Sequence, residues 1–193
     1  MDCVICKKKI GFLQKKEKLN DNEYCHVDCW ADSNQGKAYV LLVNARLKLR
    51  FSDNSDRYII ALKKVNEALK CNFYVIDLLS LKSMILGELG EHNNAINSGL
   101  EALNQFEQKY GKDYIINKIK EVHANKISQD WLIQNDTLVD LYGDTLAFVS
   151  VGYIKLKKYK EAIPYIKEEL KIYPNHKPAK TRLKICKDKL RNS

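Results

Sequence analysis

Four cysteines and one histidine lie within the first thirty residues of this 193-residue chain, and only two further cysteines follow. The clustered residues are Cys3, Cys6, Cys25, His26 and Cys29. Cys3-x2-Cys6 followed by His26-x2-Cys29 has the paired spacing of a tetrahedral zinc site. The pair Cys25-x3-Cys29 is chemically acceptable as well, because it would complete a site of four thiolates. The spacing predicts one zinc ion bound by Cys3, Cys6, His26 and Cys29, with Cys25 as the alternative to His26.

A metal ion is needed because a segment of about thirty residues has too few apolar side chains to offset the ordering of its backbone. The residues between the ligand pairs can form short strands at 9–14 and 16–19, followed by a polar turn at 20–22 and the start of a helix. Four protein ligands leave no open position for water or substrate, so we expect a structural ion rather than a catalytic one.

The ligand pattern resembles the first zinc site of a LIM domain and, more broadly, the treble-clef zinc fingers. The matching residues are Cys3, Cys6, His26 and Cys29, with Trp30 where an aromatic residue commonly follows the last ligand. The second zinc site of a LIM domain is missing. The resemblance covers residues 1–34 and implies a compact module made of a knuckle, a β-hairpin and a helix.

From about residue 37 the chain has the periodicity of amphipathic helices, without strand-type alternation of apolar residues. Polar turns separate these helices at 52–56, 89–91, 110–112 and 173–175, where helix-breaking and capping residues collect. The pattern predicts a mainly α protein with two domains, a zinc-binding module at 1–34 and a helical domain at 37–193.

An internal repeat is visible in the helical region. Ala61, Ala95 and Ala162 each precede an aliphatic residue in a stretch that ends near a leucine, and they lie 34 and then 67 residues apart. Neither of the two later stretches could bury its apolar face alone, so they must stack on their neighbours.

The segment 143–174 resembles a tetratricopeptide repeat, and 76–107 resembles one as well. Glu169 departs from the pattern, because its position is normally occupied by a small residue. The resemblance implies a solenoid of antiparallel helix pairs, closed by a capping helix that starts at Pro178, with the first helix of each pair lining a concave groove. By this resemblance, the residues expected to bind a protein or peptide partner are Asp77, Ser80, Met84, Glu88, Asp144, Ala147, Val151, Ile154 and Lys155.

Positive charge is concentrated at the end of the chain, where residues 153–193 contain thirteen Lys and Arg against four Asp and Glu. A basic surface attracts anionic partners through a force that salt screens. The alternative function is therefore nucleic-acid binding, supported by the zinc module, and the candidate anion-binding residues are Lys180, Arg182, Lys184 and Lys187.

Catalytic motifs are absent from the sequence: it has no phosphate-binding loop, no nucleophile elbow and no metal-hydrolase histidine pair. His92, His123 and His176 are isolated, and we interpret them as solvated or capping residues. The chain has no apolar run of about twenty residues and no signal peptide, which predicts a cytoplasmic protein that has no membrane segment. The sequence thus favours a non-catalytic scaffold or adaptor for protein partners, with no small-molecule substrate.

Overall fold

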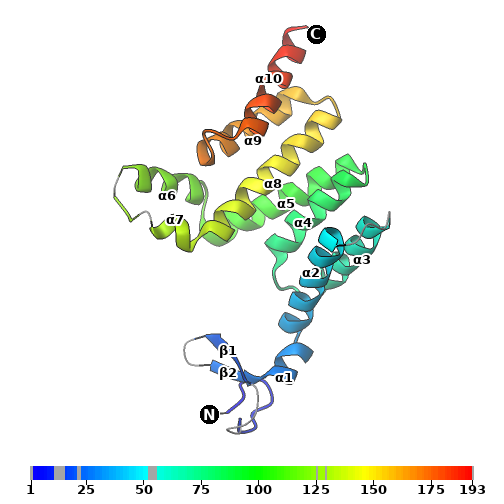
Figure 1. Cartoon of the computed structure of the whole chain (residues 1–193), viewed down its shortest axis with the longest axis vertical. Helices are drawn as coiled ribbons and strands as arrows, with labels where there is room; N and C mark the ends of the chain where they lie inside the picture. The colour runs from blue at the N-terminus through cyan, green and yellow to red at the C-terminus, as the bar shows by residue number, and fades with distance from the viewer. Residues whose placement is uncertain are drawn as a thin grey trace. The chain divides into compact units, whose positions relative to one another are not determined.

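The computed structural model describes residues 2–10, 16–20, 23–51, 56–124, 126–128 and 130–192. The protein is mainly helical, which confirms the predicted class (Figure 1). It divides into two compact units, Met1–Tyr74 and Val75–Ser193. The helices that cover residues 37–51 and 57–69, predicted as the start of the helical domain at 37–193, belong to the first of these units.

The first unit contains a pair of antiparallel strands, β1 (Lys16–Asn20) and β2 (Glu23–His26). Lys16 pairs with His26, and Glu17 pairs with Cys25. Most of the strand expected at 9–14 falls on residues 11–15, outside the described residues. The strand expected at 16–19 corresponds to β1, and its partner is β2, which carries two of the candidate ligands, Cys25 and His26.

Three helices follow, α1 (Val27–Asp32), α2 (Asn34–Phe51) and α3 (Arg57–Leu69). α2 and α3 pack together through buried residues, mostly alanines, that are spaced three and four apart and therefore lie on one face of each helix. These residues are Ala38, Leu42 and Ala45 on α2 and Ala61, Val65 and Ala68 on α3. Small side chains at these positions allow the two helix backbones to approach closely.

One residue, Ser33, separates α1 from α2. Its hydroxyl donates to the Trp30 carbonyl (2.5 Å) and accepts from the Gly36 amide (3.0 Å), so it caps the start of α2. A β-carbon on Gly36 would clash with the backbone of Trp30 and Ala31, so this sharp corner requires a glycine. The Trp30 ring also contacts Tyr39 of α2, at 5.6 Å between ring centroids.

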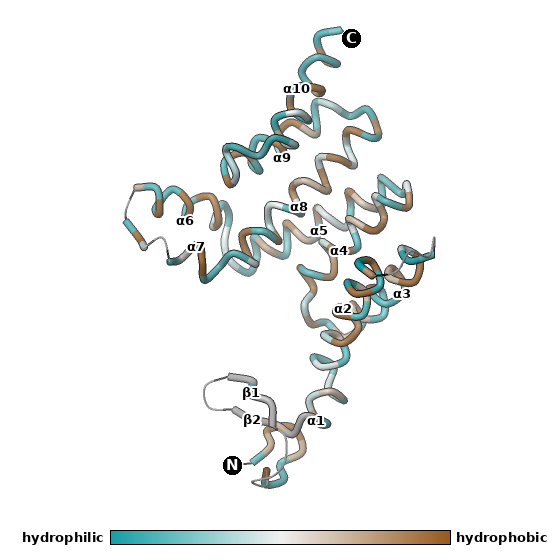
Figure 2. The backbone as a smooth tube through the Cα atoms, viewed as in Figure 1, coloured by the Kyte–Doolittle hydropathy of each residue, from teal (hydrophilic) through white to brown (hydrophobic). Residues whose placement is uncertain are grey.

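The second unit consists of helices alone, within the residues described. In chain order they are α4 (Val75–Glu88), α5 (His92–Tyr110), α6 (Tyr114–His123), α7 (Asp130–Gln134), α8 (Asp136–Lys155), α9 (Tyr159–Ile172) and α10 (Lys177–Arg191). α4 packs against α5, and α8 packs against α9. α8 also contacts both helices of the first pair, and α10 contacts both helices of the second. Apolar and polar residues alternate along these helices (Figure 2), as expected for amphipathic helices packed on one side.

Both helix pairs turn in the same way. After α4, the amide of Glu91 donates to the Leu86 carbonyl and Gly90 has φ +81°. After α8, the amide of Lys158 donates to the Tyr153 carbonyl and the intervening residue, Lys157, has φ +59°. This is the Schellman geometry, which places a left-handed residue just beyond the helix end.

Two glycines allow α5 and α8 to approach closely. A β-carbon on Gly99 of α5 would clash with Val149, and one on Gly152 of α8 would clash with Ile96. Both positions lie in helix interiors, where glycine is otherwise unfavourable. Packing between the two pairs therefore determines the residue type at these positions.

The segment between the pairs, expected at 113–140 to keep a helix without the repeat signature, forms the short helices α6 and α7. α6 has four buried aliphatic residues, and all except Val122 belong to a core shared with α5, α8 and α9. These residues are Ile115, Ile116, Ile119 and Val122. α6 contacts α9, and α7 contacts α8, so both short helices pack against the second helix pair.

Candidate functional site

The first candidate site is a group of three thiols in the first unit. The sulfur atoms of Cys3, Cys6 and Cys29 all lie within 4.8 Å of one another. A tight turn positions the first two: the Cys6 amide donates to the Cys3 sulfur (3.5 Å), and the Lys7 amide donates to the Cys3 carbonyl (2.8 Å). The third is supplied by the first turn of α1.

These sulfurs fit a tetrahedral zinc ion. Each Zn–S bond is about 2.3 Å long, so two sulfurs on one zinc lie about 3.8 Å apart. Hydrogen bonding to Cys6, burial and the nearby Cys3 raise the pKa of the Cys29 thiol to about 11. A bound divalent cation would lower this pKa, because a thiol that coordinates a metal loses its proton. The donor set is therefore suited to a cation that prefers sulfur.

Cys25 and His26, the two alternatives for the fourth ligand, are neighbours at the end of β2. Neighbouring strand residues point to opposite faces, so a regular strand directs only one of them to the three sulfurs. Cys25 is fully buried but does not belong to the group of sulfur atoms. The side chain of His26 lies outside the described residues. Its backbone stands immediately before α1, three positions ahead of Cys29.

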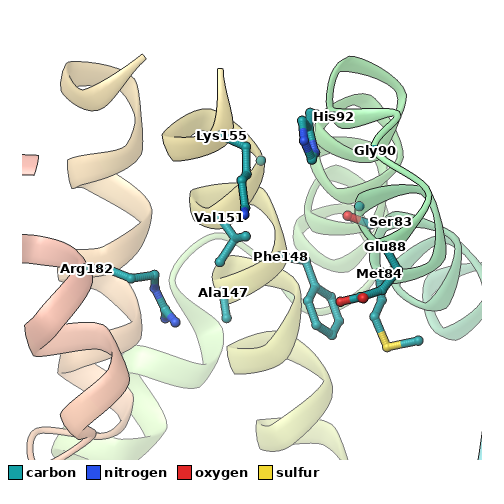
Figure 3. A pocket seen from close by; sticks show the side chains of 12 residues that line it. Ser83, Met84, Glu88, Gly90, His92, Ala147, Phe148, Val151, Lys155 and Arg182 are labelled. Atoms are coloured by element: carbon teal, nitrogen blue, oxygen red, sulfur yellow. The ribbon is translucent and has the colours of Figure 1, made fainter. Parts of the chain in front are cut away.

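The second candidate site is a cavity of about 510 Å³ in the second unit, which we call the α4–α8 groove (Figure 3). Two helices supply most of its lining, and the remainder comes from the turn before α5, from the start of α5 and from α10. The residues that line it are Ser83, Met84, Gly87, Glu88, Gly90, His92, Ala147, Phe148, Val151, Gly152, Lys155 and Arg182.

Five of the nine predicted partner-binding residues line this groove, namely Met84, Glu88, Ala147, Val151 and Lys155. The other four, Asp77, Ser80, Asp144 and Ile154, do not. Ser80 is buried, and its hydroxyl is hydrogen-bonded to that of Thr145 at 2.7 Å, so it joins α4 to α8. Ile154 packs against the core between α9 and α10.

Sequence reasoning missed several groove residues, and helical spacing could have found some of them. Phe148 lies four residues after Asp144 and three before Val151, on the same helical stripe as these two predicted residues. Gly87 carried a different signal, because a glycine in the last turn of a helix, one residue before its end, is a poor helix former. A β-carbon at Gly87 would meet no atom within 4 Å, so helix packing does not explain it.

Glu169, the residue that departs from the repeat pattern, is buried with 1% of its surface exposed. One of its carboxylate oxygens pairs with Arg182 Nη2 at 2.5 Å and the other contacts His176 Nδ1 at 2.7 Å. Both partners belong to α10 or its N-cap, so the three residues, which we call the Glu169 cluster, connect α9 to α10. His176 stands at the N-cap position of α10 with its side chain 40% exposed, as the sequence suggested, and it also contacts a buried carboxylate, which the sequence did not indicate.

Further acidic groups surround this cluster. The pKa of Asp144 is raised, mainly because the carboxyl group is partly buried and also because the carboxylates of Asp140 and Glu169 are near. His176 lowers the same pKa. The Tyr173 hydroxyl donates to Asp140 at 2.5 Å. Burial and this hydrogen bond raise the pKa of Tyr173. A partner carboxylate would be repelled at this end of α8.

The structure separates the four candidate anion-binding residues. Lys180, Lys184 and Lys187 are exposed and spaced along one face of α10. Arg182 instead points to Glu169 and lines the α4–α8 groove. Three of the four candidates, the lysines, therefore lie on one exposed basic face of α10.

Comparison with known proteins finds no family model that matches this chain and no match among curated proteins. Among the described residues, no helix has both the length and the apolar character that a membrane span requires.

Proposed function

We propose that this protein is a non-catalytic adaptor, in which a structural zinc ion stabilises the N-terminal unit and the helical second unit binds a protein partner. The observation that carries the proposal is the α4–α8 groove. It is formed by the corresponding helices of two similar pairs and lined by residues that the tetratricopeptide resemblance assigns to partner binding.

The packing order of the second unit supports a tetratricopeptide-like arrangement. The first helix of the second pair, α8, contacts both helices of the first pair, and α10 continues this pattern by contacting α8 and α9. Ala95 and Ala162 are buried at equivalent places in α5 and α9. In such an array α4 and α8 are the first helices of their pairs, and these helices line the binding surface.

A groove-filling substitution tests this function. Gly87→Leu would place a side chain in the groove, and no atom lies within 4 Å of its β-carbon. We expect proteins that co-purify with the full-length chain from a source-cell lysate to be lost with Gly87→Leu. They should be retained with the matched control Asn104→Leu, at an exposed position of α5. Equal recovery with both variants would refute the groove as the binding site.

The zinc site is proposed to consist of Cys3, Cys6 and Cys29 with His26 as the fourth ligand. Elemental analysis of protein purified without chelators should give one zinc per chain. Cys29→Ser should lose the metal and unfold the module, because metal binding contributes much of the folding energy of such a small segment. His26→Ala should do the same and Cys25→Ser should retain the metal; the reverse result would assign the fourth position to Cys25.

Nucleic-acid binding through α10 is the competing function, and the exposed stripe Lys180, Lys184 and Lys187 favours it. Its affinity would fall steeply with salt, because each phosphate contact releases counterions. A filter-binding assay at low salt tests it. No retention of RNA or DNA, or equal retention after the three lysines are changed to glutamine, would exclude this surface. Nuclease treatment of the lysate separates the two functions, since a protein partner survives it.

A further inference from the structure

The α4–α8 groove carries opposite charges on its two walls. Glu88 projects from the end of α4 and Lys155 from the end of α8, and both are exposed (Figure 3). Within the described ranges, neither side chain makes a hydrogen bond or an ion pair with another residue. Each charge is therefore available to a ligand. The groove as a whole is suited to a ligand with a positive group on one side and a negative group on the other.

Between these charges the groove is apolar. Met84 of α4 and Phe148 and Val151 of α8 supply its largest side chains, and Val151 remains 36% exposed. Gly87 lies among them with open space where its β-carbon would stand. Gly87 lies in the last turn of α4, where glycine is still a poor helix former, and no contact at its β-carbon position requires a glycine there. Its effect is to keep the groove wide enough for a large side chain.

Polar groups without partners are found at the same groove. Among the residues described, the buried side-chain nitrogen and oxygen atoms that lack a hydrogen-bond partner are His92 Nδ1 and Arg182 Nε. Both residues line the α4–α8 groove, although they come from α5 and α10. Buried polar groups are normally hydrogen-bonded, so these two atoms add unused hydrogen-bonding capacity beside the exposed charges of the groove. The carbonyl and amide groups of an extended peptide backbone supply both donors and acceptors.

We propose that the α4–α8 groove binds an extended peptide segment of a protein partner that carries a large aliphatic residue flanked by one acidic and one basic residue. The aliphatic side chain enters the space above Gly87, the acidic side chain pairs with Lys155 and the basic one with Glu88. This inference rests on the proposed adaptor function and specifies the partner that the groove recognises. Because the two charges differ, the segment binds in a single chain direction.

Two synthetic peptides test the charges. Both place leucine between charged residues at alternate positions, which point the same way in an extended chain. One contains Glu-Thr-Leu-Thr-Lys and the other the reverse order, each labelled for fluorescence polarisation with the full-length protein. We expect one order to bind at least about tenfold more tightly than the other and than a version with both charges replaced by glutamine. Equal affinity for all three peptides would overturn the proposal.

A charge exchange gives a sharper result. Lys155→Glu should weaken the preferred peptide about tenfold, and changing the acidic residue of that peptide to lysine should restore the affinity. Gly87→Leu should abolish binding, whereas Asn104→Leu should not alter it. Circular dichroism of each variant verifies that the helices remain folded.

The outcomes separate this inference from the adaptor function. If Gly87→Leu abolishes capture of the cellular partner but Lys155→Glu leaves both capture and peptide binding unchanged, the adaptor function stands and the charge assignment is wrong. If Gly87→Leu changes neither capture nor peptide binding, both are wrong. Absence of peptide binding together with a capture that depends on Gly87 also refutes the assigned peptide chemistry.

Discussion

The two helix pairs of the second unit, α4–α5 and α8–α9, are related by a shift of 67 residues but attach to their next neighbours by different means. Ala95 corresponds to Ala162, and both are buried. Ala102, however, corresponds to Glu169. The first pair meets α8 through the close contacts at Gly99 and Gly152, whereas the second pair meets α10 through the Glu169 cluster as well as an apolar core.

This difference shows that two similar helix pairs can pack against the helix that follows them through different interactions. Close packing of small residues is insensitive to charge and depends on shape. A buried carboxylate instead requires partners, because an unpaired charge away from water is strongly destabilising. The second pair therefore accepts only a following helix that brings the correct cations, and α10 supplies Arg182.

The largest expected effect comes from removing that arginine. Arg182→Leu leaves Glu169 buried with His176 alone, and we expect the free energy of unfolding to fall by about 3 kcal/mol. Chemical denaturation followed by circular dichroism measures it. The double variant Glu169→Ala, Arg182→Leu makes the second pair resemble the first and should recover most of the loss. A single variant as stable as the natural chain would show that α10 does not depend on the pairing.

The two helical glycines of the first pair should respond to alanine in opposite directions. Gly99→Ala brings its β-carbon against Val149, and overpacking of this kind costs about 1–3 kcal/mol. Gly87→Ala meets open space in the last turn of α4 and should raise the stability by about 0.5 kcal/mol through helix propensity. Thermal unfolding of the two variants measures both effects. Stabilisation by both would contradict close contact between α5 and α8.

The equivalent serines of the two pairs make different hydrogen bonds. Ser83 donates to the Ala95 carbonyl of α5 at 2.8 Å, whereas Ser150 donates to the Ala147 carbonyl of its own helix at 2.8 Å. Ser83→Ala should therefore cost about 1 kcal/mol and Ser150→Ala almost nothing, since alanine favours the helix. Urea denaturation of the two variants compares them. Equal losses would mean that the interhelical bond adds no stability.

The smallest effect is expected at the turns. Lys157 adopts the left-handed conformation that Gly90 adopts in the first pair, and a residue with a β-carbon is disfavoured there by about 1 kcal/mol. Lys157→Gly should raise the stability by about 0.5 kcal/mol, because part of the gain is lost to the greater freedom of glycine in the unfolded chain. Differential scanning calorimetry should show a slightly higher Tm. A lower Tm would indicate that the lysine side chain itself stabilises the turn.

Much of this architecture could be predicted from the spacing of residues. The helical class followed from amphipathic periodicity, and Ala95 and Ala162 are buried near the start of their helices. The strand pairing could not be predicted as well, because segments 9–14, 16–19 and 23–26 are all short. Their pairing depends on where the chain turns rather than on an apolar pattern.

Some residues of the candidate sites could be predicted from the sequence and others could not, because only some depend on local spacing. Cys3, Cys6 and Cys29 could be found because ligand spacing is local, and they lie together in the structure. Arg182 could not be placed in the groove from sequence, because its orientation depends on Glu169 of another helix. Residues whose roles are determined by tertiary contacts leave no periodic signal.

The single residue between α1 and α2 has a consequence for motion. Ser33 is hydrogen-bonded on both sides of the corner, and the Trp30 and Tyr39 rings meet across it. A module joined by one capped residue cannot tumble independently of the helix that it precedes. Nuclear spin relaxation should therefore give the thiol-bearing segment and α2 the same rotational correlation time, and limited proteolysis should find no cleavable linker at this junction.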